Sequence, residues 1–455
     1  MSTEHDIRHD RDWTKGPILR NVFALAWPSV LSMMLMTAFS ITDAFFLGQV
    51  GTVPLAAVIS SIFVIWMIYS TLQIVTIGVT AMVSRAVGEG RPEHAAYVAN
   101  QALWWGLGLA AILTAIGYYI TPFFFTIMNT APDVTAEGIK YLRIGFLGST
   151  FLLLKEVYGA VFQAAGDTRR PMITNLIAVS INIILDPILI FGLFGMPRLE
   201  TVGAAIATIS AYASASLIYT FFIKTGRLRV PMKLGMPRKP DFELFKRIVK
   251  IGLPPSIGDI VFCTVYLFLN EIVSGYGTFA IAALGIGNRL ESLNYMVAHG
   301  FGMASATLVG QNLGAKQPER AERSAWYTVA VVAVWTGIVG AAFVVLREPL
   351  AAIFLTDPQA QTALHSYLIL LGATQVFMGV EIVLYFGFTG AGNTLPPTII
   401  SIPGSILRVP IALWMGETLG LGLDGVWWAL TITMVLRGIA ITIWFRLNRW
   451  KKQKV

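Results

Sequence analysis

Long apolar runs alternate with short polar segments along the whole chain. Each run holds roughly 20 or more mostly apolar residues, enough to cross a hydrocarbon core about 30 Å thick as a helix. The runs are continuous and lack the alternation typical of transmembrane strands, so they predict helices. We expect twelve spans, near residues 18–47, 55–84, 97–120, 139–164, 171–194, 201–223, 248–274, 280–309, 325–346, 364–389, 397–414 and 423–445.

The composition agrees with an all-α polytopic membrane protein. Of the 455 residues, 55% are hydrophobic and only 13% are charged, whereas soluble domains carry about 25% charged residues. This argues against an ordinary soluble enzyme and a disordered chain. The single cysteine, Cys263, cannot form a disulfide within the chain, which excludes a secreted disulfide scaffold.

Lysine and arginine are distributed unevenly between the two sides of the predicted bundle. If the N-terminus is cytoplasmic, 25 of the 33 lysines and arginines lie on the cytoplasmic side and three on the outer side. By the positive-inside rule, both termini should be cytoplasmic, with the chain in the cytoplasmic (inner) membrane. The net charge of +8 then faces lipid headgroups, and we expect no nucleic-acid partner. The polar stretch Met1–Asp12 does not resemble a cleavable signal peptide, so the first apolar run should be kept.

The chain contains an internal repeat at an offset of 226 residues, carried mainly by glycines and prolines that fix turns and kinks. The matches include Pro28 with Pro254, Gly88 with Gly314, Pro132 with Pro358, Gly166 with Gly392 and Pro171 with Pro397. Each repeat contains six spans, so both insert in the same direction, as in transporters built from parallel repeats. We expect an N-terminal lobe at 14–223, a cytoplasmic connector at 224–247 and a C-terminal lobe at 248–446.

Motifs for nucleotide or metal chemistry are weak or missing. Residues Gly420–Gly425 fit the pattern G-x-G-x-x-G, but they follow no strand and lie between two spans on the outer side. The sequence has no Walker A motif, and its five histidines show no metal-ligand spacing. We therefore expect no cofactor and no ATP-driven step within this chain.

Polar residues cluster on one face of the fifth span. Asn175, Asn182 and Asp186 are spaced by seven and four residues, which places them on the same side of a helix. Pro187 cannot donate a hydrogen bond to the carbonyl of Ile183, so that oxygen is free. A carboxylate, an amide and a free carbonyl are hard oxygen ligands suited to a small cation.

Asp43 on the first span and Thr208 on the sixth should reach a similar depth from the outer side as Asp186. A charge inside the bilayer costs about 2.5–3.5 kcal/mol, so such positions ask for a functional reason. The repeat partners of Asp43, Asn182 and Asp186 are Leu269, Arg408 and Ala412. This asymmetry favours a proton or cation site in the N-terminal lobe alone. The alternative is a packing hydrogen bond between Asp43 and the fifth span.

Weaker candidates lie elsewhere in the spans. Asp259 and Glu381 occur at similar depth in the second repeat and form a candidate second pair, and Arg408 could pair with Glu271 or Glu291. Three residues of the first span, Met33, Met36 and Phe39, could line an adaptable apolar substrate cavity, although helix packing is the alternative use.

These motifs together resemble the multidrug and toxic compound extrusion (MATE) transporters. The resemblance covers about Trp13 to Arg446 and rests on Ala26-Trp27-Pro28 and the segments 42–48, 163–171, 182–187, 203–208 and 308–315. It implies two six-helix lobes around a central cavity, and the export of organic, often cationic compounds in exchange for Na⁺ or H⁺.

The resemblance also implies a branch of the family. Asp43, Asn182, Asp186 and Thr208 look like the cation site of the DinF-like members. In the branch with a C-lobe cation site, the acidic positions would fall near Phe262 and Met378, and neither is acidic here. Asp259 and Glu381 each lie about one helical turn away, so a displaced C-lobe site stays open.

The function we expect is that of a monomeric secondary antiporter, not an enzyme. It would export organic, cationic, lipophilic compounds by alternating access, with H⁺ or Na⁺ as coupling ion at Asp43, Asn182, Asp186 and Thr208. One alternative keeps the fold and moves a lipid-linked or other endogenous metabolite. A membrane-embedded enzyme is the other, and it lacks a motif in the short outer loops.

Overall fold

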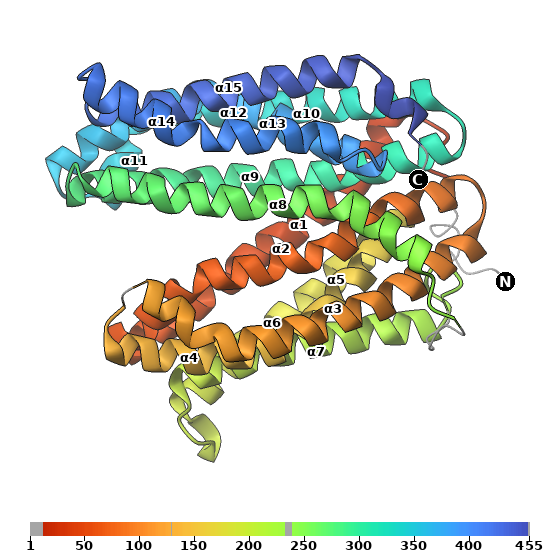
Figure 1. The fold of residues 1–455 in the computed structure, drawn as a ribbon, viewed down its shortest axis with the longest axis horizontal. Helices are drawn as coiled ribbons and strands as arrows, with labels where there is room; N and C mark the ends of the chain where they lie inside the picture. Colours follow the sequence, from red (N-terminus) through yellow and green to blue (C-terminus); the bar gives the residue numbers. More distant parts are fainter. Residues whose placement is uncertain (1–11, 129, 233–238, 454–455) are drawn as a thin grey trace. The chain divides into compact units, whose positions relative to one another are not determined.

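The computed structural model describes residues 12–128, 130–232 and 239–453. Most of the polar N-terminal stretch and residues 233–238 of the connector lie outside these ranges. All regular structure in the described residues is helical (Figure 1). The first half contains α1 (Ile18–Val50), α2 (Thr52–Gly88), α3 (Pro92–Ile127), α4 (Pro132–Leu147), α5 (Ser149–Ala164), α6 (Arg169–Phe191), η1 (Leu193–Gly195) and α7 (Glu200–Lys224).

The second half follows the same plan. It contains α8 (Phe242–Ser274), α9 (Thr278–Gly314), α10 (Pro318–Val345), α11 (Arg347–Phe354), α12 (Pro358–Gly390), α13 (Leu395–Ile406), α14 (Arg408–Leu413), η2 (Trp414–Thr418), α15 (Leu423–Arg446) and η3 (Arg449–Lys452). The expected all-α architecture is confirmed.

Most of these helices are long and apolar enough to cross a membrane. Within the described residues, ten helices meet that test, and the bent pair α4–α5 makes an eleventh span. The long helix α9 covers the remaining expected span at 280–309. The expectation of twelve spans is therefore approximately met, and the chain is a multi-pass membrane protein.

Two expected spans are broken helices rather than continuous ones. The run at 139–164 bends by 48° between α4 and α5. The break falls at Gly148, where an added Cβ would lie 2.3 Å from Cγ1 of Ile209 on α7. The run at 397–414 is divided into α13, α14 and η2. Pro403 and Pro410 each remove a backbone donor there, which weakens a continuous helix.

The chain forms two compact units that exchange short segments. Unit 1 includes residues 31–253 and unit 2 includes residues 13–30 and 254–455. The chain passes from one unit to the other next to Pro28 on α1 and at Pro254 on α8, two prolines at equivalent positions of the repeat. Residues 13–30 and 242–253 therefore pack with the half of the chain opposite to the one expected from the repeat.

The exchanged segments are firmly packed in their units. Val22 and Leu25 are fully buried in the core of unit 2, among residues of α9, α10, α12 and α15. In unit 1, the start of α8 docks on α3. The hydroxyl of Tyr97 donates to Asp241 at 2.9 Å, and the ring of Trp105 lies 4.5 Å from that of Phe245.

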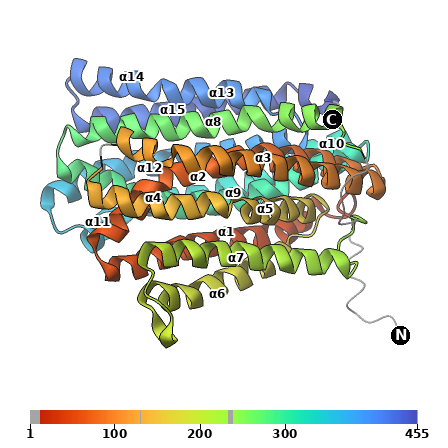
Figure 2. The same ribbon diagram turned by 60° about the horizontal axis from the view of Figure 1, so that its bottom comes forward.

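Two helix pairs position the residues of interest. In unit 1, α6 runs beside α7, and in unit 2 the broken helix α13–α14 runs beside α15 (Figures 1 and 2). In Figure 1, the connection between α6 and α7 extends below the other helices of unit 1. Phe194, which lies in η1 within this connection, is 90% exposed.

Candidate functional site

Two carboxylates from different helices meet inside unit 1. Asp43 of α1 is 8% exposed and Asp186 of α6 is completely buried, and their side chains lie close enough to interact. The hydroxyl of Thr208 on α7 donates to Oδ2 of Asp43 at 3.4 Å. Nδ2 of Asn182 donates to Oδ1 of Asp186 at 3.3 Å. The structure thus brings the four main candidates together from three helices.

Several oxygens of this cluster have no hydrogen-bond partner among the described residues. They are Oδ1 of Asp43, Oδ1 of Asn182 and Oδ2 of Asp186, all of them buried. A buried polar atom without a partner costs about 1–3 kcal/mol, so three in one place are unusual. A proton or a small hard cation between them would supply the missing interactions.

The side chains of the cluster are hard oxygen ligands, so they favour a proton or a small hard cation. The cluster offers two carboxylates, an amide oxygen and a hydroxyl, which suit H⁺ or Na⁺ rather than a transition metal. In the described part of the chain, no group of three or more His, Cys, Asp or Glu side chains could hold a metal ion.

Close packing of α6 on α7 sets the geometry of the cluster. An added Cβ at Gly203 would lie 2.6 Å from the carbonyl oxygen of Leu189, so only glycine allows this approach. Gly192 ends α6 in the left-handed conformation at φ 75°. The N–H of Leu199 then donates back to the carbonyl of Leu189 at 3.0 Å. These contacts hold Thr208 at the level of the carboxylates.

Two tyrosines next to the cluster were missed from the sequence. Tyr141 of α4 is 7% exposed, and both it and Tyr212 of α7 lie within electrostatic range of Asp43. The ring of Phe39 stacks on that of Tyr212, with centroids 6.2 Å apart and 16° between the planes. The spacing of Tyr212 four residues after Thr208 could have indicated it, whereas Tyr141 carries no such signal.

The other candidates of unit 1 lie along the same helices. Asn175 is 8% exposed, and its buried Oδ1 has no hydrogen-bond partner among the described residues, but it makes no hydrogen bond with the cluster. Phe39 packs against α6 and α7. The sulfur of Met36 lies 3.8 Å from Nζ of Lys155. Met33 is partly exposed, and its backbone carbonyl accepts from the hydroxyl of Thr37 at 3.3 Å.

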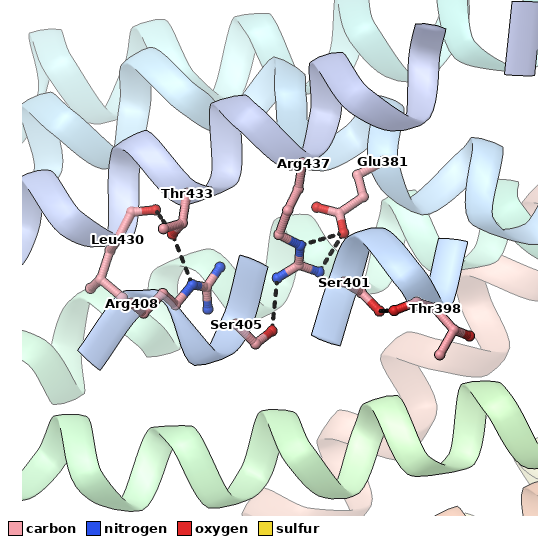
Figure 3. A network of polar contacts seen from close by, with 8 residues as sticks. All are labelled: Glu381, Thr398, Ser401, Ser405, Arg408, Leu430, Thr433 and Arg437. Carbon is pink, nitrogen blue, oxygen red and sulfur yellow. Dashed lines mark hydrogen bonds and ion pairs between the residues drawn. The ribbon is translucent and has the colours of Figure 1, made fainter. Parts of the chain in front are cut away.

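In unit 2, Glu381 of α12 pairs with an arginine instead of an acid. Arg437 of α15 donates from Nε to Oε1 of Glu381 at 2.8 Å, and its Nη2 contacts the same oxygen (Figure 3). Nη1 of Arg437 donates to Ser405 of α13 at 3.3 Å. Asp259 of α8 is partly buried and lies within electrostatic range of Tyr295, but it forms no ion pair with another of the described residues.

Arg408 of α14 pairs with neither acid considered for it. It is 2% exposed, and its Nε donates to the hydroxyl of Thr433 on α15 at 3.1 Å (Figure 3). No ion pair within 4.0 Å joins it to Glu271 or Glu291 among the described ion pairs. Glu291 instead accepts from Gln375 at 3.4 Å. Arg408 and Glu291 line a cavity of about 10 Å³, enough for about one water molecule.

Comparison with known proteins gives consistent matches over nearly the whole chain. The family model MatE matches residues 28–188 and 254–414, two segments that begin 226 residues apart, which is the offset of the repeat. The chain is 30% identical to "Probable multidrug resistance protein NorM" of Thermotoga maritima, over 96% of this chain and 94% of the relative.

Two further matches bear on cargo and fold. The "FAD transporter" of Shewanella oneidensis is 30% identical over 93% of this chain and 94% of the relative. Among solved structures, "MATE in the straight conformation" covers 97% of this chain and 98% of its own, with a TM-score of 0.89 at 23% identity. That structural match establishes the shared fold.

Proposed function

Because this chain belongs to the MatE family of transporters, we propose that it is a secondary antiporter that exports organic, lipophilic cations in exchange for H⁺ or Na⁺. Members of the family are transporters rather than enzymes. Export of several drugs is supported by the names of relatives such as NorM, and "Multidrug export protein MepA" of Staphylococcus aureus, which is 26% identical over 94% of this chain and 93% of the relative. We further propose a monomer in the cytoplasmic membrane with both termini cytoplasmic.

The observation that carries the proposal is the carboxylate pair Asp43–Asp186 with its unpartnered oxygens. Two buried carboxylates that lie within interaction range repel each other when both are ionised. Uptake of one proton or one Na⁺ removes that repulsion and stabilises the packing of α1 against α6 and α7. Release of the ion favours a different packing. An organic cation that prefers this second packing is then coupled to the ion, because two ligands with opposite preferences affect each other reciprocally.

We favour H⁺ as the coupling ion, with Na⁺ as its competitor. A proton shared by Asp43 and Asp186 needs only the two carboxylates. A Na⁺ ion needs more oxygens, which the side chain of Asn182, the hydroxyl of Thr208 and the carbonyl of Ile183 would provide. The same oxygens cannot serve both ions at once, so the two should compete. This arrangement also supports assignment to the DinF-like branch.

Efflux of ethidium from cells, with pH and Na⁺ gradients imposed separately, tests the coupling. Asp186→Asn should abolish gradient-driven export while insertion and expression stay near normal. Asn182→Ala should weaken Na⁺ dependence more than proton dependence, because an amide oxygen binds a cation but need not carry the proton. Efflux that requires Na⁺ and does not depend on pH would contradict H⁺ as the coupling ion. Efflux that depends on neither gradient would contradict the antiport mechanism.

A second candidate cargo is an endogenous metabolite, including a lipid-linked precursor. The specific observation in its favour is the 30% identity to a relative named as an FAD transporter, which carries an anionic compound. The acidic cluster of unit 1 favours cations instead. Vesicles containing the purified protein distinguish the two: uptake of FAD without uptake of ethidium would support the metabolite.

A further inference from the structure

A lysine is buried in unit 1, apart from the carboxylate cluster. The side chain of Lys155 on α5 is 7% exposed, and its Nζ lies 2.7 Å from Oε1 of Glu156. Adjacent residues on a helix point about 100° apart, so neighbours do not normally face each other. The side chains of Lys155 and Glu156 nevertheless meet.

The ammonium group of Lys155 has two further neighbours, a thioether and an aromatic ring, and both attract cations. The sulfur of Met36 on α1 lies 3.8 Å from Nζ of Lys155. The ring centroid of Tyr212 on α7 lies 5.5 Å from the same nitrogen. A carboxylate, an aromatic face and a polarisable thioether together make a favourable environment for an organic cation. Here the chain's own lysine fills that environment.

The carboxylate of the pair is more accessible than the lysine. The side chain of Glu156 is 23% exposed, against 7% for Lys155. Tyr69 of α2 also lies close to Glu156, which adds a second aromatic ring. A buried ion pair contributes little more stability than apolar residues of similar size, so stability alone gives no reason for this pair.

The pair lies near the carboxylate cluster without being part of it. Met36 and Asp43 are seven residues apart on α1, which corresponds to about 10 Å along the helix. The stacked rings of Phe39 and Tyr212 lie on the same helices between the two levels. A ligand beside Glu156 would therefore contact the aromatic layer that adjoins Asp43.

We propose that Glu156, Tyr212 and Met36 form the subsite for the charged group of an organic monocation, and that Lys155 is a resident counter-ion which the ligand displaces. This inference rests on the proposed export of organic cations and names how the cation is recognised. Because one positive charge replaces another, Glu156 is never left unpaired in the buried site. The return of Lys155 assists release, so the ligand binds with only moderate affinity, as export requires.

Equilibrium binding of ethidium to the purified full-length protein in detergent, without any ion gradient, tests the subsite. Lys155→Met keeps the length of the side chain and removes the competing charge, so it should tighten binding by about tenfold. Glu156→Gln should weaken binding by a similar factor. Lys140→Met is the matched control: it removes the same charge from unit 1, but at a side chain that is 57% exposed and paired with Glu137. Its affinity should equal that of the wild type.

The outcomes separate this inference from the antiport mechanism. Lys155→Met that binds ethidium no more tightly than Lys140→Met would overturn it. So would Glu156→Gln that binds as tightly as the wild type, and this second variant decides the matter if Lys155→Met does not fold. Gradient-driven efflux with unchanged affinities in both variants would overturn the subsite and leave the antiporter intact. Altered affinities in both variants, together with efflux that does not depend on an ion gradient, would support the subsite and contradict the antiport mechanism.

Discussion

Adding one methyl group at Gly203 should disturb the carboxylate cluster from a distance. In Gly203→Ala, the new Cβ would lie 2.6 Å from the carbonyl oxygen and 2.7 Å from the carbonyl carbon of Leu189. Ordinary contacts begin near 3.4 Å, so α7 must move from α6 by about 0.8 Å, because backbone atoms cannot rotate away. The hydrogen bond from Thr208 to Asp43 is already 3.4 Å long, and such a shift breaks it.

The expected cost is that of an overpacked core, about 1–3 kcal/mol of unfolding free energy. Thermal unfolding in detergent and ethidium efflux measure the two effects, and efflux should lose its ion dependence. Gly108→Ala is the control, since an added Cβ there meets nothing within 4 Å. In a helix this change should be neutral or stabilise by up to about 1 kcal/mol. If Gly203→Ala matches Gly108→Ala in stability and keeps ion-dependent efflux, the packing argument is wrong.

Three further outcomes are expected. Glu381→Gln leaves Arg437, which is 13% exposed, without its counter-ion, so it should destabilise by about 3–5 kcal/mol, and adding Arg437→Met should restore most of the loss in melting temperature. The pKa of Asp241 is lowered, chiefly because backbone N–H groups at the start of α8 donate to its carboxylate. The ionised carboxylate therefore stabilises the fold above its ordinary pKa, and this stabilisation is lost as pH falls through the lower pKa of the folded state. The wild type should melt at a higher temperature than Asp241→Ala near neutral pH, and the difference should vanish in acid. On a cysteine-free background, a membrane-impermeant maleimide should label Phe194→Cys in sealed cells but not Arg229→Cys. Labelling of Arg229→Cys would contradict the predicted orientation.

Much of the fold could be predicted from the sequence, because a membrane span is identified from the hydropathy of its own residues. A run such as 171–194 needs no distant partner to be identified, since its backbone groups bond within the helix and its side chains need only be apolar. It appears as α6 at Arg169–Phe191. The repeat could also be recognised without knowledge of tertiary contacts, because glycines and prolines at a constant offset mark equivalent turns. Both family-model segments begin at its prolines, Pro28 and Pro254.

Part of the candidate site was also readable. Asn182 and Asp186 share a face because they are four residues apart on one helix, and the structure shows their hydrogen bond. Asp43 and Thr208 were linked to them only by depth in the membrane, which the bilayer imposes on every span. The structure adds the direct contact between these two, at 3.4 Å. The role of this cluster in coupling stays a prediction.

Contacts that depend on how one helix is rotated against another were decided by tertiary structure alone. Depth allowed Glu381 to face Asp259, but the helix rotations turn it toward Arg437. Arg408 likewise meets Thr433 on α15 and forms an ion pair with neither acid named for it. The sequence fixes how deep a residue lies along its own helix. Which neighbour it faces depends on packing at points such as Gly203, where a backbone approach of a few ångströms sets the angle and register of both helices.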